Sequence, residues 1–432
     1  MSLPSEIQTL ILMHFLRQDN GVNLTVGDGP LENLSDVCFL WRDLIEDVPQ
    51  FWSAFSLRLT DQIDSETLIQ SCSEIYKRLQ LYLSRSKDTK LSICLQINSD
   101  NSACEEVKQL SLRITTLLKS PSHVNRWQDM ELACTATFAT KLLKLDDSLS
   151  PAGPLSLTLI LPEAPYDVPP DFTIQSLLVP FSATLNELSL NTRLVDLKTC
   201  LEILAQFPKL HRYKAVIHCE SDFNVSPGLQ PACRLEHLDL ELQKISPVQA
   251  SVEHPLQDLA QLMEAVTLGE LTSLRIHWAS STSPDGEGGR ALSATFSKCT
   301  KLRNLAIINL PLDQDGFDAC IGALTDLRRL SISYPDPQFP SPISRNFFRA
   351  LCGHEGTMQF PQLEMLDISI HSDNAGKKNI HELLERRTKA RGCHALKELS
   401  VQCDMNCQRD SCTAWQQELS ATYPSLTVNI YQ

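Results

Sequence analysis

Residues 235–240 read LEHLDL, and the L-x-x-L-x-L spacing in this stretch decides the fold. Apolar residues two positions apart lie on one face of a β-strand, so this spacing predicts a strand with one buried face. Similar stretches, with first positions 25 to 36 residues apart, occur at Leu185-Leu188-Leu190, Leu271-Leu274-Ile276, Leu302-Leu305-Ile307, Leu327-Leu330-Ile332, Leu363-Leu366-Ile368, Leu396-Leu399-Val401 and, more weakly, Leu210-Tyr213-Ala215. Recurrence of one local unit predicts a stack of similar strands that cover one another.

Amphipathic runs with helical spacing separate these strands, at residues 194–206, 256–266, 292–297, 317–324, 347–351, 380–390 and 415–421. Pro208, Pro361 and Pro424 precede three of the strands, where a proline ends the preceding helix. The alternation resembles an irregular leucine-rich-repeat-like α/β solenoid, although its repeats are longer than the usual length of about 20 to 29 residues. A doubly wound α/β domain also alternates strands and helices, but it does not repeat one local pattern.

The sequence before the repeats predicts a mixture of helices and strands. Residues 64–84 and 105–118 have helical spacing, and residues 91–97 alternate as a half-buried strand does. We therefore expect an α+β chain with a small helical module at 1–57, a connecting helix–strand–helix region at 58–120 and the solenoid at 121–432. Segments rich in Pro, Gly or Ser are expected to be loops between repeats, at 148–154, 162–170, 280–289 and 334–342.

Two apolar stripes lie in the first 57 residues. Pro4 and Glu6 suit the first turn of a helix. The stripes consist of Ile7, Leu10, Ile11 and Phe15 in one run and Val37, Leu40, Trp41, Leu44 and Ile45 in the next. The two stripes are expected to pack together, but so short a segment makes a marginal domain by itself. Part of the apolar surface is therefore expected to face another protein.

These residues resemble an F-box, in the form common in fungal F-box proteins. The match lies within residues 1–57, about an eighth of the chain, and its matching positions are Leu3-Pro4-x-Glu6-Ile7, Val37-Cys38-x-x-Trp41-Arg42-x-Leu44 and Pro49-x-Phe51-Trp52-Ser53. Two later segments are similar to those that follow the F-box in such proteins, namely Ser84-Arg85-Ser86 with Leu91-Ser92-Ile93, and Arg126-Trp127-x-x-Met130-x-Leu132. The sequence departs from the family at Phe39, which replaces a basic or polar residue, and at the long insert 18–30.

The resemblance implies that the module docks on the adaptor protein of an SCF-type ubiquitin ligase and through it on a cullin. The contact residues carried over from the family are Leu3, Pro4, Ile7, Ile11, Val37 and Trp41. The remaining chain would present an unknown target protein to the ligase. The alternative is a leucine-rich-repeat scaffold, outside any ubiquitin ligase, whose N-terminal helices are only a cap on the domain behind them.

The composition narrows the remaining function classes. A net charge of −14 and a sequence pI of about 5.3 disfavour binding to nucleic acid, which needs a basic surface. The sequence has no apolar run near the length of about 20 residues that spans a bilayer, and no signal peptide is recognised. We therefore expect a cytoplasmic or nuclear protein that does not bind membranes. The 15 cysteines, an odd number, are expected to be reduced and mostly buried.

Motifs that carry catalysis or hold a cofactor are not found. The glycine-rich stretch 286–289 lacks the Lys-Ser/Thr of a phosphate-binding loop and is expected to be a plain loop. Cys403, Cys407, Cys412 and the pair Cys393-His394 do not match the spacing of common zinc sites, so no metal is expected. Basic residues between 377 and 391 faintly resemble a nuclear signal but suit a helix C-terminus better. The protein is expected to be no enzyme and to need no cofactor.

The repeats themselves predict where a target would bind. If the leucines of each strand point inward, their neighbours form a row on the opposite face of the sheet. From this row we select Asp239, Arg275, His277, Arg329 and Asp367 as target-binding residues. The inserted loops, above all 280–289, are the alternative binding site, because loops often carry function.

Overall fold

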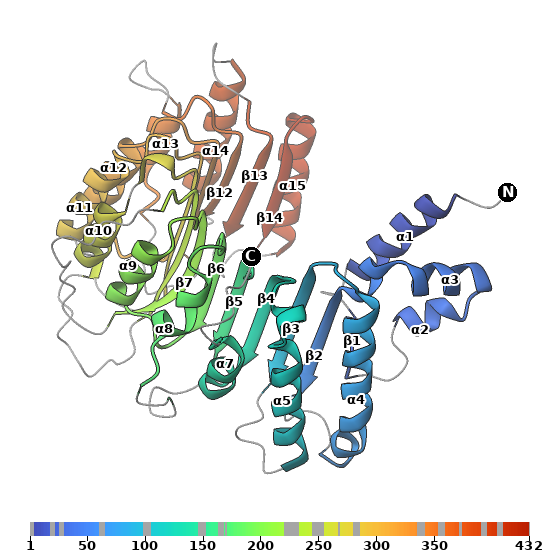
Figure 1. Ribbon diagram of the computed structural model, residues 1–432. Helices are drawn as coiled ribbons and strands as arrows, with labels where there is room; N and C mark the ends of the chain where they lie inside the picture. The colour runs from blue at the N-terminus through green and yellow to red at the C-terminus, as the bar shows by residue number, and fades with distance from the viewer. Residues whose placement is uncertain are drawn as a thin grey trace. The chain divides into compact units, whose positions relative to one another are not determined.

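The computed structural model describes residues 4–17, 22–25, 30–59, 65–97, 105–145, 153–162, 168, 171–219, 233–243, 255–266, 268–279, 286–334, 342–352, 359–370, 374–389, 395–403 and 409–431. They form two compact units. The first comprises Met1–Leu194 with Gln206–Leu210, and the second comprises Val195–Ala205 with His211–Gln432. Figure 1 labels their helices and strands.

The first unit opens with a cluster of short helices. These are α1 (Ser5–Arg17), α2 (Pro30–Ser35), α3 (Phe39–Asp47) and the 3-10 helix η1 (Pro49–Trp52). Proline begins both α2 and η1, where its fixed backbone angle suits a first turn. The buried apolar side chains of this cluster are Leu12, Leu31, Ile45, Phe51 and Trp52.

A parallel sheet forms the rest of the first unit. Its strands pair in chain order: β1 (Val22–Asn23), β2 (Ala54–Leu59), β3 (Leu91–Ile97), β4 (Trp127–Cys134), β5 (Ser156–Leu161) and β6 (Glu187–Thr192). Its helices are α4 (Ser65–Arg85), α5 (Glu105–Leu118), α6 (Pro121–Val124), α7 (Ala136–Leu143), α8 (Ile174–Leu178) and η4 (Val179–Phe181). Figure 1 shows α4, α5 and α7 on one face of this sheet.

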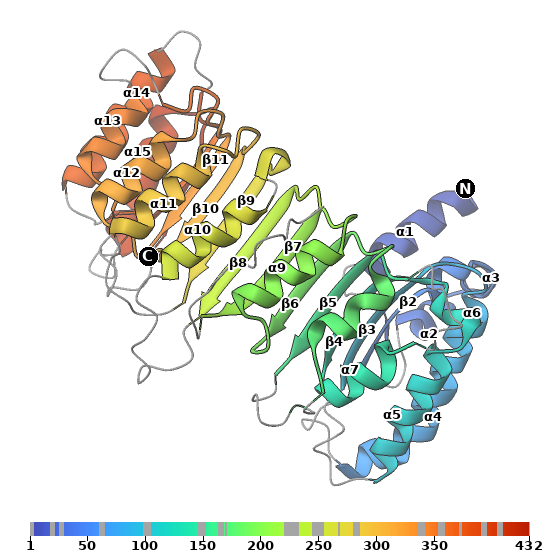
Figure 2. The same ribbon diagram turned by 60° about the vertical axis from the view of Figure 1, so that its left-hand side comes forward.

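The second unit repeats the same arrangement. Its parallel strands are β7 (Arg212–His218), β8 (His237–Gln243), β9 (Ser273–Trp278), β10 (Asn304–Ile308), β11 (Arg329–Ser333), β12 (Met365–Ile370), β13 (Glu398–Cys403) and β14 (Thr427–Tyr431). Its helices are α9 (Leu197–Gln206), α10 (Pro255–Ala265), η5 (Leu268–Glu270), α11 (Gly286–Phe296), α12 (Gln314–Gly322), α13 (Arg345–Cys352), α14 (Asn374–Lys389) and α15 (Arg409–Thr422). In Figure 2, α10 to α15 lie along one side of these strands.

The leucines of successive repeats are aligned across the second unit's sheet. Leu238 is paired with Leu274, and the same row continues through Leu305, Leu330, Leu366 and Leu399. All six side chains are at most 3% exposed. Complete burial of a leucine stabilises the fold by about 1.5–3 kcal/mol, so this row is a large share of the core. The predicted repeat of parallel strands and helices is confirmed.

The predicted domain boundaries at 57 and 120 remain predictions. Parallel pairing nevertheless runs across both positions, because β2 contains residue 57 and β3 pairs with β4 across residue 120. Most of the predicted loops at 148–154, 162–170 and 334–342 lies outside the described residues, as does 280–285.

The glycine-rich stretch 286–289 is not a loop, which corrects the sequence interpretation. Its four residues form the first turn of α11. A Cβ atom on Gly289 would lie 2.7 Å from the Cα of Gly316 in α12, and the reverse contact would be 3.0 Å. The glycines therefore allow two neighbouring helix backbones to approach closely, and the Sγ of Cys320 lies 3.3 Å from the carbonyl oxygen of Gly289 at this contact.

We predict that Gly289→Ala lowers the free energy of unfolding by about 1–2 kcal/mol. Alanine favours a helix by up to about 1 kcal/mol over glycine, but an added methyl group in a closed backbone contact costs about 1–3 kcal/mol. Urea unfolding followed by circular dichroism measures the difference. Gly322→Ala is the matched control, because nothing lies within 4 Å of a Cβ atom on this helical glycine. Equal stability of the two variants would contradict the close contact.

Cysteines are part of the core, as the sequence predicted. Among the described residues twelve cysteines are free thiols, and ten of these are buried. Burial raises the pKa of Cys219 and of Cys320 to about 12, with the Asp258 charge contributing at Cys219. A thiol whose pKa is raised in the folded state resists ionisation there, while the unfolded chain ionises at its ordinary pKa of 9.0.

The free energy of unfolding should therefore fall as the pH rises above 9. The stabilising contribution of each buried thiol is complete below the unfolded pKa and is lost as the pH approaches the folded pKa. Urea unfolding at pH 8, 9 and 10 tests this, and Cys320→Ala should show a shallower decline over that range. A flat profile in the wild-type protein would contradict the prediction.

Candidate interaction surfaces

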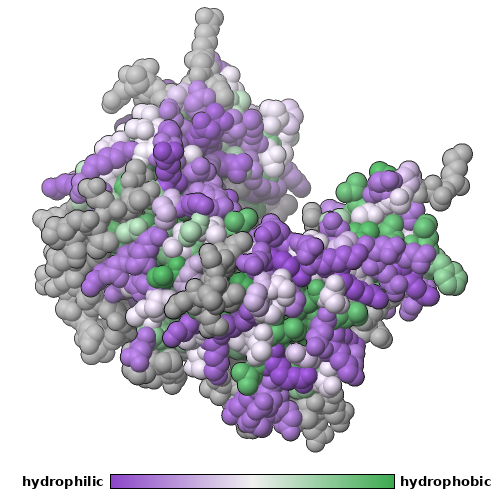
Figure 3. All heavy atoms as spheres, viewed as in Figure 1, coloured by the Kyte–Doolittle hydropathy of each residue, from purple (hydrophilic) through white to green (hydrophobic). Residues whose placement is uncertain are grey.

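The N-terminal helices expose an unusual number of large apolar side chains. Of the eleven that are exposed in the described parts of the chain, six lie between residues 7 and 40. They are Ile7 (43% exposed), Leu10 (62%), Ile11 (51%), Val37 (61%), Phe39 (79%) and Leu40 (48%). Figure 3 shows hydrophobic residues gathered on this end of the first unit. We call these six side chains the apolar patch.

The patch exists because α1 presents its broader apolar stripe outward. Gln8 and Leu12 are buried, whereas Ile7, Leu10 and Ile11 lie at i, i+3 and i+4 on the other side of the helix. Part of the apolar surface of the two stripes was expected to face another protein, and these three side chains are exposed. The side chain of Phe15 lies outside the described residues.

The six predicted adaptor-contact residues have different surroundings. Pro4, Ile7, Ile11 and Val37 are exposed and free to contact a partner. Trp41 is only partly exposed, and its Nε1–H donates a hydrogen bond to the Oε1 of Gln8 at 3.1 Å. Trp41 thus joins α3 to α1. Leu3 lies outside the described residues.

Phe39 was not among the predicted adaptor-contact residues, although its departure from the family pattern was expected to alter the affinity for the adaptor. It is the most exposed large apolar side chain among the described residues. The Arg42 guanidinium lies 5.4 Å from its ring centroid, within the range of a cation–π contact. Arg42 also lies 3.5 Å from a carboxylate oxygen of Asp36 and donates to the carbonyl oxygen of Ser35.

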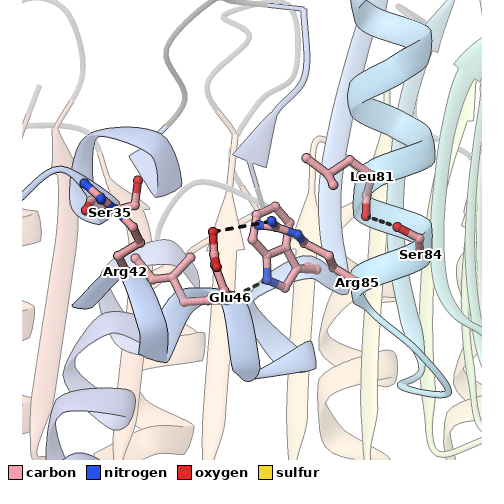
Figure 4. Close-up of polar contacts among 8 residues, drawn as sticks. Ser35, Arg42, Glu46, Leu81, Ser84 and Arg85 are labelled. Atoms are coloured by element: carbon pink, nitrogen blue, oxygen red, sulfur yellow. Dashed lines mark hydrogen bonds and ion pairs between the residues drawn. The ribbon is translucent and has the colours of Figure 1, made fainter. Parts of the chain in front are cut away.

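The end of α3 is fastened to α4 by charge and ring contacts. The Nη2 of Arg85 lies 3.4 Å from the Oε1 of Glu46, as drawn in Figure 4. The same guanidinium lies 4.5 Å from the ring centroid of Trp52. Trp52 donates a hydrogen bond to the carbonyl oxygen of Ile45 at 2.7 Å. Its ring also packs edge-on against Tyr82 of α4. These contacts hold the helices that carry the apolar patch against the sheet-bearing part of the first unit.

The turn after α4 is held by a buried arginine from the segment before β4. Arg126 is 8% exposed and donates to the carbonyl oxygens of Thr89 at 2.9 Å and Leu83 at 3.4 Å, and to the Oγ of Ser86. Lys87 within the turn has φ 48°, a left-handed conformation that is uncommon outside glycine. Two segments singled out in the sequence, 84–86 and 126–127, thus meet in the structure. We call the hydrogen bonds from Arg126 to Leu83, Ser86 and Thr89 at the end of α4 the Arg126 clamp.

The second unit offers a different surface, the outward face of its strands. Asp239 lies between Lys214 and Arg275, with nitrogen–oxygen distances of 3.8 and 3.9 Å. The Nδ1 of His277 lies 3.7 Å from a carboxylate oxygen of Glu241. Charged side chains on this part of the sheet therefore pair with one another across adjacent strands.

An open hollow of about 330 Å³ lies further along the same face, over β9 to β13. Its lining residues are Ser273, Leu274, Arg275, Asn304, Leu305, Ala306, Arg329, Leu330, Ser331, Met365, Leu366, Asp367, Glu398 and Ser400. Three of the five predicted target-binding residues, Arg275, Arg329 and Asp367, line this hollow. The other two, Asp239 and His277, lie outside it.

One of the two acidic side chains that line the hollow, that of Asp367, already accepts hydrogen bonds. Asp367 accepts hydrogen bonds from Ser331 at 2.9 Å and from the hydroxyl of Tyr431 at 3.3 Å. Burial, and next the Asp367 charge, raise the pKa of Tyr431 to about 12, so this hydroxyl remains a donor. The sequence analysis missed Tyr431, because β14 lacks the full L-x-x-L-x-L pattern. A strand was predicted there from Pro424, which ends the preceding helix.

Metal and membrane sites do not emerge from the described residues. Cys403 lies in β13 and Cys412 in α15, while Cys393, His394 and Cys407 lie outside the part that the structure describes. Within that part, no three His, Cys, Asp or Glu side chains are grouped to hold a metal ion. Its helices are all too short or too polar to cross a bilayer.

Comparisons with known proteins give remote structural similarity alone. No protein-family model matches the sequence, and no curated protein matches it. A Bacteroides fragilis protein structure is 12% identical with TM-score 0.35, covering 76% of this chain and 84% of its own. The leucine-rich repeat-containing protein LegL7 from Legionella pneumophila is 13% identical with TM-score 0.34, covering 79% and 99%. TLR13, in its complex with ssRNA13, is 15% identical with TM-score 0.31, covering 71% and 39%. Similarity this low identifies no family, so the repeat architecture rests on the strand pairing itself.

We predict that Arg126→Ala destabilises the first unit by about 2–4 kcal/mol, because it leaves three acceptors without their charged donor. Thermal unfolding measures the loss. Arg58→Ala, which removes an exposed arginine from β2, is the control for the change of charge and should unfold like the wild type. Arg126→Lys should recover only part of the loss, since an ammonium group cannot reproduce the planar fork of donors. Full stability of Arg126→Ala would refute the clamp.

Proposed function

We propose that this protein is the substrate-recognition subunit of an SCF-type ubiquitin ligase. The apolar patch docks on the adaptor protein and through it on a cullin, and the repeats bind a target protein. The single observation that carries the proposal is the patch itself, which lies on the helices whose residues resemble an F-box. The chain acts by bringing the target near the ligase and performs no covalent step of its own.

The energetics of the patch support docking to a protein. Six large apolar side chains held in water have a strong tendency to be covered, since each gains about 1.5–3 kcal/mol on complete burial. Contiguous exposed apolar surface on a folded protein commonly marks an interaction site. The patch combines one face of α1 with Val37 and the start of α3. A partner protein can therefore contact both helices at once.

The attachment of the helices to the sheet supports the same role. The Glu46–Arg85 contact and the Arg126 clamp restrict movement between the patch and the strands of the first unit. A receptor that works by proximity benefits from such a connection, because the adaptor is then held at a fixed place on this unit. The alternative is a leucine-rich-repeat scaffold outside any ligase. In that scaffold the same contacts would merely attach a cap.

Negative charges introduced into the apolar patch test the proposal. The double variant Ile7→Asp with Val37→Asp should reduce binding to a purified SCF adaptor at least about a hundredfold, as expected when central apolar contacts of about 2 kcal/mol or more are lost. Both side chains are exposed, so circular dichroism should remain unchanged. Titration calorimetry measures the binding.

The matched control is Leu112→Asp with Leu155→Asp. These leucines are 53% and 43% exposed on the same unit but lie outside the patch. The control variant should bind like the wild type. Absence of adaptor binding by the wild-type chain would favour the scaffold, and equal binding by both double variants would exclude the patch as the docking site.

A further inference from the structure

We infer that the hollow over β9 to β13 binds an acidic side chain, a carboxylate or a phosphoryl group, of an extended peptide segment. This inference deepens the proposed target-binding role of the repeats and rests on it. The carrying observation is a pair of arginines, Arg275 and Arg329, that line the hollow on either side of Asn304 and Ala306 of β10.

The two arginines approach the hollow from strands that flank β10. Arg275 pairs in register with Ala306, and Arg329 pairs with Asn304. The strands of the two arginines are thus about 10 Å apart, twice the usual strand spacing. Along the strands the two arginines are offset by two residues, so Asn304 lies beside Arg329 and Ala306 beside Arg275. Ala306 leaves the space next to Arg275 open because its side chain is a single methyl group. Two long guanidinium side chains can therefore close over one group bound above Ala306.

The guanidinium groups of Arg275 and Arg329 both retain hydrogen-bond donors that the protein does not use. Arg329 is exposed, and among the residues that the structure describes its guanidinium group forms neither an ion pair nor a hydrogen bond. Arg275 has one long contact, at 3.9 Å, with an Asp239 that Lys214 also approaches. Guanidinium groups offer a planar fork of donors that matches a carboxylate or phosphate. Such a group would take up the donors that the protein leaves unused.

Neither Asp367 nor Glu398, the two acidic residues that line the hollow, forms an ion pair with these arginines among the described residues. Asp367 instead accepts hydrogen bonds from Ser331 and Tyr431. Glu398 lines the far end, on β13, and is separated from Arg329 by Met365 of β12. The hollow is therefore cationic over β9 to β11 and acidic at its other end. This polarity suits a peptide that crosses the strands with its acidic side chain over Ala306.

A peptide-selection experiment tests the inference with the full-length chain and no adaptor. Three degenerate nine-residue peptide pools carry aspartate, phosphoserine or lysine at the centre, and immobilised protein selects from them. The wild type should retain at least one of the acidic pools about tenfold or more over the lysine pool, since charge-assisted hydrogen bonds are gained. The ratio of the two acidic pools identifies which anionic group the hollow takes.

Arg275→Ala with Arg329→Ala should abolish the acidic preference. Arg345→Ala with Arg349→Ala is the matched control, because it removes two exposed arginines of α13 and the same charge. Equal retention of acidic and lysine pools by the wild type would overturn the inference, and so would a preference that survives the first double variant. Adaptor binding is measured separately, so a failed peptide selection leaves the docking proposal standing, and a failed docking test leaves the peptide result unaffected.

Discussion

The structure depends on the burial of leucines between neighbouring parallel strands. A single strand–helix repeat has one apolar face and too little surface of its own to cover it. The in-register row from Leu238 to Leu399 covers this face, because each strand from β9 to β12 lies between two strands that carry a leucine at the same position. The opposite face of each strand is then free to vary. Binding groups can accumulate there without disturbing the core.

The helices of neighbouring repeats also pack against one another, and some of these contacts leave no room for a larger side chain. Gly289 and Gly316 let α11 and α12 approach backbone to backbone, which side chains of any size would prevent. Cysteines fill other closed positions as small apolar residues, and their raised pKa values reflect the absence of water around them. Close packing on the helix side thus keeps the outward strand face in a regular register.

The two candidate surfaces use opposite physical means. The apolar patch gathers side chains that water disfavours, and its partner is expected to be held mainly by their burial. The hollow instead offers donors from Arg275 and Arg329 on a protein whose overall charge is −14. A receptor with one apolar and one polar surface can distinguish its permanent partner from its targets, since the two kinds of contact do not compete.

Local spacing in the sequence was sufficient to predict the strands, the helices between them and the parallel stack. These features depend on periods of two and of about 3.6 residues, which neighbouring residues define by themselves. The same spacing predicted Arg275, Arg329 and Asp367 as surface residues, because successive residues of a strand alternate between its two faces and these three lie opposite the leucines. Only the tertiary structure decided that Ile7 and Ile11 stay in water while Leu12 is buried, since that choice depends on the rotation of α1 against α3. It likewise showed that Asp367 accepts a hydrogen bond from Tyr431, that the guanidinium group of Arg329 has no partner among the described residues and that Arg126 holds the turn after α4. Each of these contacts joins positions far apart in the chain, and no local pattern records which distant residue will lie beside which.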